Sequence, residues 1–298
     1  MMEPHMFDNR GMLRILFKQG VANTKALRTL SLSRCGMTDR NIIDLLKALK
    51  KIQLTELNLS ENSLGERGVE ELGKHVVKFG RYLKILNVYG NNCHDEGAKV
   101  LCNAVLKHPN LTSLNIGMND LTPKSVDSII YLLRSKSNLH TFECALNFLG
   151  RSTSRVLAEM VLNNTIHKLD LSYNCATETS IPLFQRMLRK NKTLTDLNFE
   201  GNQLPPEAGN HLSHIFSLRT VKEKDDGETG TKTSENTTLL HLAIFNGNFI
   251  PTQVTQIIEV ALENNRKNYG LKKYPWRPEM LRPKYDTGKT DSGGCAVM

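Results

Sequence analysis

The sequence predicts an α/β solenoid, a fold in which short strands and helices alternate along one axis. Three observations support this: an apolar pattern that recurs through most of the chain, an asparagine at a fixed place in it, and an amphipathic segment after each copy. Residues 111–121, LTSLNIGMNDL, have the clearest copy. Eight copies start at Leu27, Leu54, Leu83, Leu111, Leu139, Ile166, Leu194 and, more loosely, Leu239, which are 27, 29, 28, 28, 27, 28 and 45 residues apart.

Each place in the pattern has a structural task. The first, fourth and sixth places, such as Leu54, Leu57 and Leu59, are expected to point from a strand into the core and to stack on the next copy. The ninth place is an asparagine whose amide can pair buried backbone groups of the turn. These asparagines are Asn62, Asn91, Asn119, Asn147, Asn174 and Asn202. Cys35 takes the ninth place in the first copy and Gly247 in the last, so we expect the row of asparagines to end before a terminal repeat.

The segments after the strands have the periodicity of amphipathic helices, for example residues 68–79 and 125–133. One helix on the outer side of every repeat predicts a curved horseshoe. We assign residues 1–26 to an N-terminal helical cap, 27–268 to the repeat domain and 269–298 to a flexible basic tail. The polar insertion 219–236 predicts a mobile surface loop, with a partner-binding element as the alternative.

The composition is typical of a soluble, folded chain, since 39% of its 298 residues are hydrophobic and 23% are charged. Charges interrupt the apolar residues of the first 20 positions, and no apolar run reaches membrane-spanning length. The six cysteines suggest no disulfide framework, because residues such as Cys35 and Cys144 fall on inward repeat positions. These features predict a cytoplasmic protein with reduced thiols.

The span from Leu27 to about Asn268 resembles the ribonuclease-inhibitor-like leucine-rich repeat family, which includes the Ran GTPase-activating protein and the repeat domains of NOD-like receptors. The resemblance rests on the inward leucines and the asparagines, so it implies a horseshoe scaffold without naming a partner. The chain is not cysteine-rich, as ribonuclease inhibitor is, and its C-terminal segment is basic where that of the Ran activator is acidic. No arginine here matches the essential loop arginine of the Ran activator.

The last four residues, Cys295, Ala296, Val297 and Met298, match the C-a-a-X prenylation signal, and the final methionine is typical of farnesyl transfer. Much of the net charge of +9 lies just before them, which predicts attraction to an anionic membrane surface. The basic residues of this segment are Lys272, Lys273, Arg277, Arg282, Lys284 and Lys289. Trp276 suits either the membrane interface or a lid on the last helix. We therefore predict recognition by a prenyltransferase and a lipid anchor at the cytosolic face of a membrane.

Side chains at the third, fifth and seventh places alternate with the buried leucines and should form the concave face. This face is polar and leans acidic, which argues against nucleic acid and favours a protein partner with a basic patch. A merely solvated face is the alternative. The predicted partner-binding residues are Glu56, Asn58, Asn87, Tyr89, Asn115, Glu143, Asp170, Asp196, Asn198 and Glu200.

Catalytic and metal-binding arrangements are not recognisable in the sequence. His167, Asp170 and Ser172 lie close together on one strand, but their types alone do not make a triad, and no histidine has a metal-ligand spacing with cysteine. We expect a monomer without enzymatic activity, cofactor or metal. The leading hypothesis is a membrane-tethered protein-interaction scaffold. The alternatives are a regulator of the catalysis of a small GTPase, and a microbial effector prenylated in a eukaryotic host.

Overall fold

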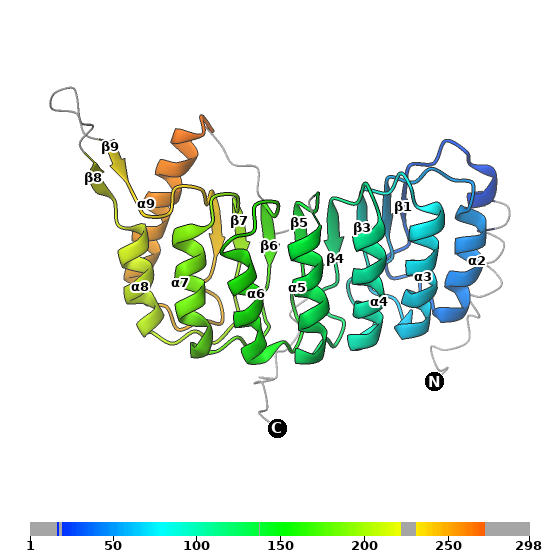
Figure 1. The fold of residues 1–298 in the computed structure, drawn as a ribbon, viewed down its shortest axis with the longest axis horizontal. Coiled ribbons are helices and arrows are strands. Elements are labelled where there is room, and N and C mark those ends of the chain that lie inside the picture. Colours follow the sequence, from blue (N-terminus) through cyan, green and yellow to red (C-terminus); the bar gives the residue numbers. More distant parts are fainter. Residues whose placement is uncertain (1–16, 18–19, 137, 222–230, 272–298) are drawn as a thin grey trace, which may run out of the picture.

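The computed structural model describes residues 17, 20–136, 138–221 and 231–271, which form a solenoid of two layers. Figure 1 shows the helices side by side in one layer and the strands of a single sheet in the other. The helices are α2 (Asp39–Leu49), α3 (Gly65–Phe79), α4 (His94–Lys107), α5 (Val126–Ser135), α6 (Thr153–Met160), α7 (Ile181–Lys190), α8 (Glu207–Phe216) and α9 (Thr252–Asn268). The predicted α/β solenoid is confirmed.

Eight strands form one parallel sheet in the order β1-β2-β3-β4-β5-β6-β7-β10. They are β1 (Thr29–Ser31), β2 (Glu56–Asn58), β3 (Ile85–Asn87), β4 (Ser113–Asn115), β5 (Thr141–Glu143), β6 (Lys168–Asp170), β7 (Asp196–Asn198) and β10 (His241–Ala243). Equivalent places of the pattern are opposite each other, as Leu57, Leu86 and Leu114 are on β2, β3 and β4. A residue at a given place of one repeat therefore lies beside the residues at that same place in the adjacent repeats.

The core lies between the sheet and the helices. Leu57, Leu86, Leu114, Phe142 and Leu169 hold the fourth place of successive strands, and none is more than 3% exposed. Burying one such side chain contributes about 1.5–3 kcal/mol, so a stack of this kind supplies much of the stability of the array.

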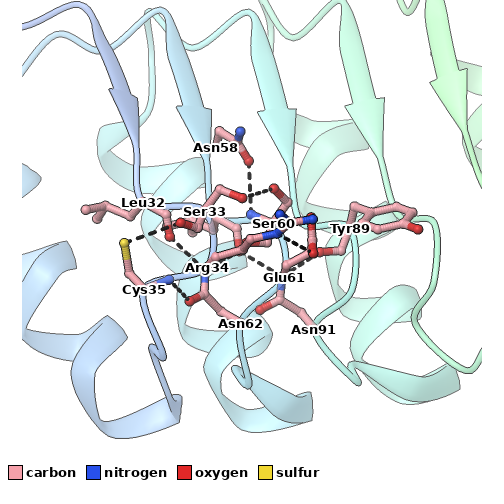
Figure 2. A network of polar contacts seen from close by, with 11 residues as sticks. Leu32, Ser33, Arg34, Cys35, Asn58, Ser60, Glu61, Asn62, Tyr89 and Asn91 are labelled. Carbon is pink, nitrogen blue, oxygen red and sulfur yellow. Dashed lines mark hydrogen bonds and ion pairs between the residues drawn. The ribbon is translucent and has the colours of Figure 1, made fainter. Parts of the chain in front are cut away.

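The ninth-place asparagines join each repeat to the one before it, as Figure 2 shows for Asn62. Its Oδ1 accepts hydrogen bonds from the backbone N–H groups of Cys35 and Met37, each 3.0 Å long. Its Nδ2 donates to the carbonyl oxygens of Leu32 at 2.9 Å and Leu59 at 2.8 Å. One amide thus pairs backbone groups of two repeats, as the pattern predicted.

The row of asparagines continues into the last repeat, so its predicted end at Gly247 is wrong. Asn248 takes the ninth-place role, and its Oδ1 accepts from the N–H groups of Asn202 at 3.1 Å and Leu204 at 2.9 Å. Strand β10 has the predicted register with β7. One extra residue is therefore accommodated between β10 and the turn, where Gly247 adopts a φ of 66°, which glycine reaches without strain.

A second row of polar side chains pairs the turns that lead into the strands, and the sequence analysis missed it. Its members lie three residues before the start of a copy: His108, Lys136, Asn163, Asn191 and Asn236. Asn191 is typical, since its Nδ2 donates to the carbonyl of Met160 at 2.7 Å and its Oδ1 accepts from the N–H of Leu194 at 2.7 Å. The constant distance of three residues between these side chains and the start of a copy is the sequence feature that could have predicted this row.

The insertion between α8 and β10 has structured ends. Strands β8 (Arg219–Val221) and β9 (Thr231–Thr233) pair antiparallel, and Glu235 beyond them accepts a 2.7 Å hydrogen bond from Nε of Arg189 on α7. The prediction of a loop throughout 219–236 is therefore wrong at both ends. Residues 222–230 lie outside the described part of the chain.

The two ends of the chain are described only in part. Within the predicted cap, Phe17 is buried in the core and Val21–Asn23 form a 3-10 turn. Description stops at Leu271, so Cys295 and the six basic residues predicted to face a membrane lie outside the described residues.

Candidate partner-binding face

The strands place the ten predicted partner-binding residues on the side of the sheet away from the helices. Eight of them belong to strands β2 to β7, and the other two, Tyr89 and Glu200, come two residues after β3 and β7. On β2, β4 and β5 the central residue is buried while its two neighbours are partly exposed, as alternation in a strand requires. The solenoid thus brings together residues that are far apart in the sequence.

The fifth-place side chains have a local structural task that the sequence analysis missed. Oδ1 of Asn58, Asn87, Asn115 and Asn198 accepts a hydrogen bond from the backbone N–H two residues later, over 2.9–3.2 Å. Asp170 does the same with the N–H of Ser172 at 2.9 Å. Such Asx turns bend the chain at the ends of β2, β3, β4, β6 and β7. The asparagines on this face are therefore accounted for by backbone geometry without a partner.

Three of the predicted contact residues are buried, which leaves little of their side chains open to a partner. Tyr89, Asp196 and Glu200 are 7%, 4% and 6% exposed. The Tyr89 ring covers Gly117, where an added Cβ would lie 2.8 Å from Cδ2 of the ring. Glu200 accepts a 2.6 Å hydrogen bond from Nδ2 of Asn246 in the last repeat. Contacts with adjacent repeats, such as these of Tyr89 and Glu200, are an effect that single-strand alternation cannot reveal.

Glu143 and Asp170 face each other on neighbouring strands, because they are register partners in β5 and β6. Asn115 Nδ2 donates to Glu143 Oε2 at 2.5 Å, and Asn198 Nδ2 donates to Asp170 Oδ2 at 3.1 Å. Burial raises the pKa of Glu143 to about 7, and the negative charge of Asp170 adds to the rise. The pair is a negative centre that a cationic group would neutralise.

An exposed apolar row lies on the same repeats, at a place that the sequence analysis did not consider. Met118, Leu146 and Tyr173 hold the eighth place of three successive copies and are 44%, 37% and 39% exposed. Their φ angles are 50°, 56° and 54°, because the chain turns sharply after each strand. The N–H of Leu146 donates to the carbonyl of Ser172, the residue before Tyr173, at 2.9 Å, so this bond joins the turns of two adjacent repeats.

The eighth place has a different character toward the N-terminus, as Figure 2 shows. There Arg34 and Glu61 hold it in the first two copies, and Arg34 Nε lies 2.7 Å from Glu61 Oε2. The third copy has Gly90. The apolar row is thus confined to the fourth, fifth and sixth copies, and this change of residue type along one place was the signal that could have revealed it.

The residues considered for catalysis do not form a triad. Ser172 Oγ donates to Asp170 Oδ1 at 2.7 Å, while Nδ1 of His167 is 2.8 Å from the carbonyl oxygen of Thr165. Within the described ranges, no group of three or more histidine, cysteine, aspartate or glutamate side chains could hold a metal ion. Burial also raises the pKa of the Cys93 and Cys102 thiols to about 12, which keeps them protonated.

No helix in the part of the chain that the structure describes has the length and apolar character needed to cross a membrane.

Comparisons with known proteins agree with the fold. The Leucine Rich repeat family matches residues 52–73 and 107–129. Ribonuclease inhibitor of Sus scrofa is 26% identical over 217 residues, which cover 62% of this chain and 48% of that protein. The Rho GTPase-activating protein gacW of Dictyostelium discoideum is 25% identical over 266 residues, covering 81% and 23%. The NACHT, LRR and PYD domains-containing protein 13 of Homo sapiens is 30% identical over 174 residues, covering 58% and 14%.

Among solved structures, the tropomodulin C-terminal domain of Caenorhabditis elegans aligns with 13% identity and a TM-score of 0.41, over 68% of this chain and 95% of that one.

The repeats and the register of the sheet define the fold as an α/β solenoid of leucine-rich repeats, and the Leucine Rich repeat family matches two stretches of it. Its similarity to ribonuclease inhibitor and to the NACHT, LRR and PYD proteins supports the ribonuclease-inhibitor-like type that the sequence resembles. The chain spans less than half the length of each of these three curated relatives.

Proposed function

We propose that the chain is a protein-interaction scaffold whose concave face binds a partner through the fourth to sixth repeats. The observation that carries the proposal is the apolar row of Met118, Leu146 and Tyr173, which shares these repeats with the Glu143–Asp170 pair. Exposed apolar side chains gathered beside charged groups are typical of protein-binding sites. The proposed partner presents an apolar anchor to the row and a basic group to the carboxylate pair.

The two parts of this face contribute differently to binding. Burying the apolar row stabilises the complex by about 25 cal/mol for each Å² removed from water. The carboxylates guide encounter and select a partner of opposite charge, which affects the association rate more than the affinity. A partner that offers only a basic group would bind weakly, and a partner that offers only an apolar anchor would bind without selectivity.

Replacing Leu146 by aspartate tests the proposed contact. The new carboxylate would need to lose water in an apolar contact and would repel Glu143, so we expect affinity for the partner to fall at least tenfold, which is about 1.4 kcal/mol. Aspartate tolerates the φ of 56° at this position, so the fold should persist. The measurement is affinity capture from a cell extract with quantification of each bound protein.

The matched control is Leu162→Asp, because Leu162 lies two residues after α6 and is 86% exposed. We expect a protein that is retained by the unmodified chain and by Leu162→Asp but lost by Leu146→Asp. Equal retention of every captured protein by the two variants would place the binding surface elsewhere.

We further propose that the scaffold is tethered to a membrane. The sequence Cys295-Ala296-Val297-Met298 supports this, since it matches a prenylation signal, together with the basic residues from Lys272 to Lys289. One lipid chain binds membranes only marginally, and each basic residue held near an anionic surface adds about 1 kcal/mol. Lipid and charge together would give durable attachment, whereas either alone would not.

Replacing Cys295 by serine should move the protein from membranes to cytosol, because serine offers no thiolate for alkylation. Fractionation of eukaryotic cells, combined with isoprenoid labelling, measures both effects. Cys35→Ser is the control, since it also removes one thiol but leaves the signal intact. A Cys295→Ser protein that stays on membranes, or an unmodified chain that takes up no isoprenoid, would refute tethering.

A second candidate is regulation of a small GTPase, favoured by the similarity to the Rho GTPase-activating protein gacW over 81% of this chain. An arginine that reaches the bound nucleotide would be required. Among the residues at the third, fifth, seventh and eighth places of the eight copies, one is an arginine, Arg34. It forms an ion pair with Glu61. Acceleration of GTP hydrolysis that is lost in Arg34→Ala would favour this candidate. A microbial effector prenylated in a host remains the other alternative, which the source organism would decide.

A further inference from the structure

A cleft opens between α2 and α3 in the helix layer of the solenoid, whereas the concave face is formed by the strand layer. Its volume is about 240 Å³. Ile43 and Leu46 of α2 and Phe79 of α3 line its apolar part, and Lys50 and Lys78 line it with charge. A volume below the roughly 300–1,000 Å³ of drug-sized ligand sites fits one compact group better than an extended ligand.

Two lysines in this cleft have ammonium groups without a carboxylate partner in the described part of the chain. Lys50 Nζ lies 5.6 Å and Lys78 Nζ 5.3 Å from the centre of the Phe79 ring. Among the residues that the structure describes, neither forms an ion pair. The aromatic ring attracts both cations weakly and leaves their charges uncompensated.

The other lysines of the cleft are already paired. Lys74 Nζ lies 2.9 Å from Glu70 and 2.8 Å from Glu71, and Lys47 Nζ lies 3.4 Å from Asp44. The local positive excess therefore belongs to Lys50, which directly follows α2, and Lys78 of α3, and both lie near the Phe79 ring.

We propose that the cleft between α2 and α3 binds a phosphate monoester group, carried either by a small soluble molecule or by a lipid headgroup. The two unpaired ammonium groups match the two negative charges of such a group, and lysine binds phosphate as a point charge. Ile43, Leu46 and Phe79 border the site on one side, while both lysines are exposed and can be reached from solvent. This site is independent of the proposed partner-binding face.

His75 supports the assignment. Its ring lies 5.1 Å from the Phe79 ring, on the same side of α3 as the cleft that it lines. Burial, and then the charge of Lys50, lower the pKa of His75 to about 4, so the ring is neutral at physiological pH and can donate one N–H to an anion. A bound anion would offset the charge of Lys50 and raise the pKa of His75, which makes this residue a reporter of binding.

The test uses the full chain made in bacteria, which carries no prenyl group. Inorganic phosphate is titrated at low ionic strength and pH 7.5 while the His75 ring signals are followed by nuclear magnetic resonance, and the pKa of His75 is measured with and without phosphate. The test variant is Lys50→Gln/Lys78→Gln. The control is Lys107→Gln/Lys190→Gln, which removes the same charge from exposed positions on α4 and α7.

We expect saturable phosphate binding with a raised His75 pKa, an affinity at least tenfold lower in Lys50→Gln/Lys78→Gln, and an affinity within twofold of the unmodified chain in the control. Equal losses in both double variants would mean nonspecific charge attraction and would overturn the proposal. So would the absence of saturable binding, or binding of a poly-glutamate peptide at this cleft without binding of phosphate.

Vesicles distinguish the two sources of the phosphate group. Phosphatidylcholine vesicles with and without phosphatidylinositol 4-phosphate are compared by sedimentation for the same three proteins. Recruitment by the monophosphate lipid that depends on Lys50 and Lys78 supports the site and assigns a lipid headgroup. Phosphate binding without such recruitment supports the site and assigns a soluble ligand.

Discussion

Replacing Asn119 by alanine should lower the free energy of unfolding by about 1 to 3 kcal/mol. The Asn119 side chain is fully buried in the middle of the array. Its Oδ1 accepts from the N–H groups of Asn91 at 3.1 Å and Cys93 at 3.2 Å, and its Nδ2 donates to the carbonyls of Val88 at 3.0 Å and Gly117 at 2.8 Å. Alanine leaves all four backbone groups without this partner, in a place that water reaches poorly.

The control is Asn103→Ala on the exposed face of α4, which makes the same chemical change without breaking the row. It should be neutral or slightly stabilising, because alanine is the better helix former. Chemical denaturation measures both variants. Equal unfolding midpoints for Asn119→Ala and the unmodified chain would contradict the central role assigned to the ninth place.

The fold could be predicted because a solenoid repeats one local arrangement. An inward leucine such as Leu57 has the same neighbours in every copy, so a single pattern specifies strand, register and core together. The prediction failed where the chain departs from the period. Asn248 lies one residue later than the pattern requires, and the spacing alone pointed to Gly247 instead. An insertion in a turn can be tolerated by backbone geometry that sequence spacing does not encode.

The candidate site could be predicted less completely, because exposure depends on neighbouring repeats. Alternation along β7 assigned Asp196 to the concave side of the sheet, but it could not reveal that the residue is only 4% exposed. The role of Asn58 in a turn was also hidden, since an asparagine serves a backbone turn and a partner equally well. Leu146 was missed because its place follows the strand, where the alternation ends.

Glu143→Gln should make the protein more stable above pH 7 and leave its stability almost unchanged near pH 4. The pKa of Glu143 is raised from 4.5 to about 7, first by burial and then by the charge of Asp170, while the Asn115 hydrogen bond and Lys168 act in the opposite direction. Between these two pH values the folded protein keeps a proton that the unfolded chain has released. Stability therefore falls as pH rises through this window and levels off above pH 7.

Glutamine cannot ionise, so the variant avoids this loss, and we expect a gain of about 1 to 3 kcal/mol at pH 8. Denaturation at pH 4, 6 and 8 measures it. Glu56→Gln is the control, because Glu56 has Thr29 and Ile85 as its register neighbours and no facing carboxylate on those strands. A gain from Glu143→Gln that is equal at all three pH values would show that the carboxyl group does not titrate in a buried setting.

The same carboxyl group connects stability with the proposed partner. A basic group seated at Glu143 and Asp170 would favour the ionised form of Glu143, so binding below pH 7 would release a proton and would weaken as the pH falls. Any stability that the solenoid loses by keeping Glu143 ionised near pH 7 would be recovered when the partner binds. In Glu143→Gln the partner affinity should become less dependent on pH between 6 and 8, while the free protein becomes more stable.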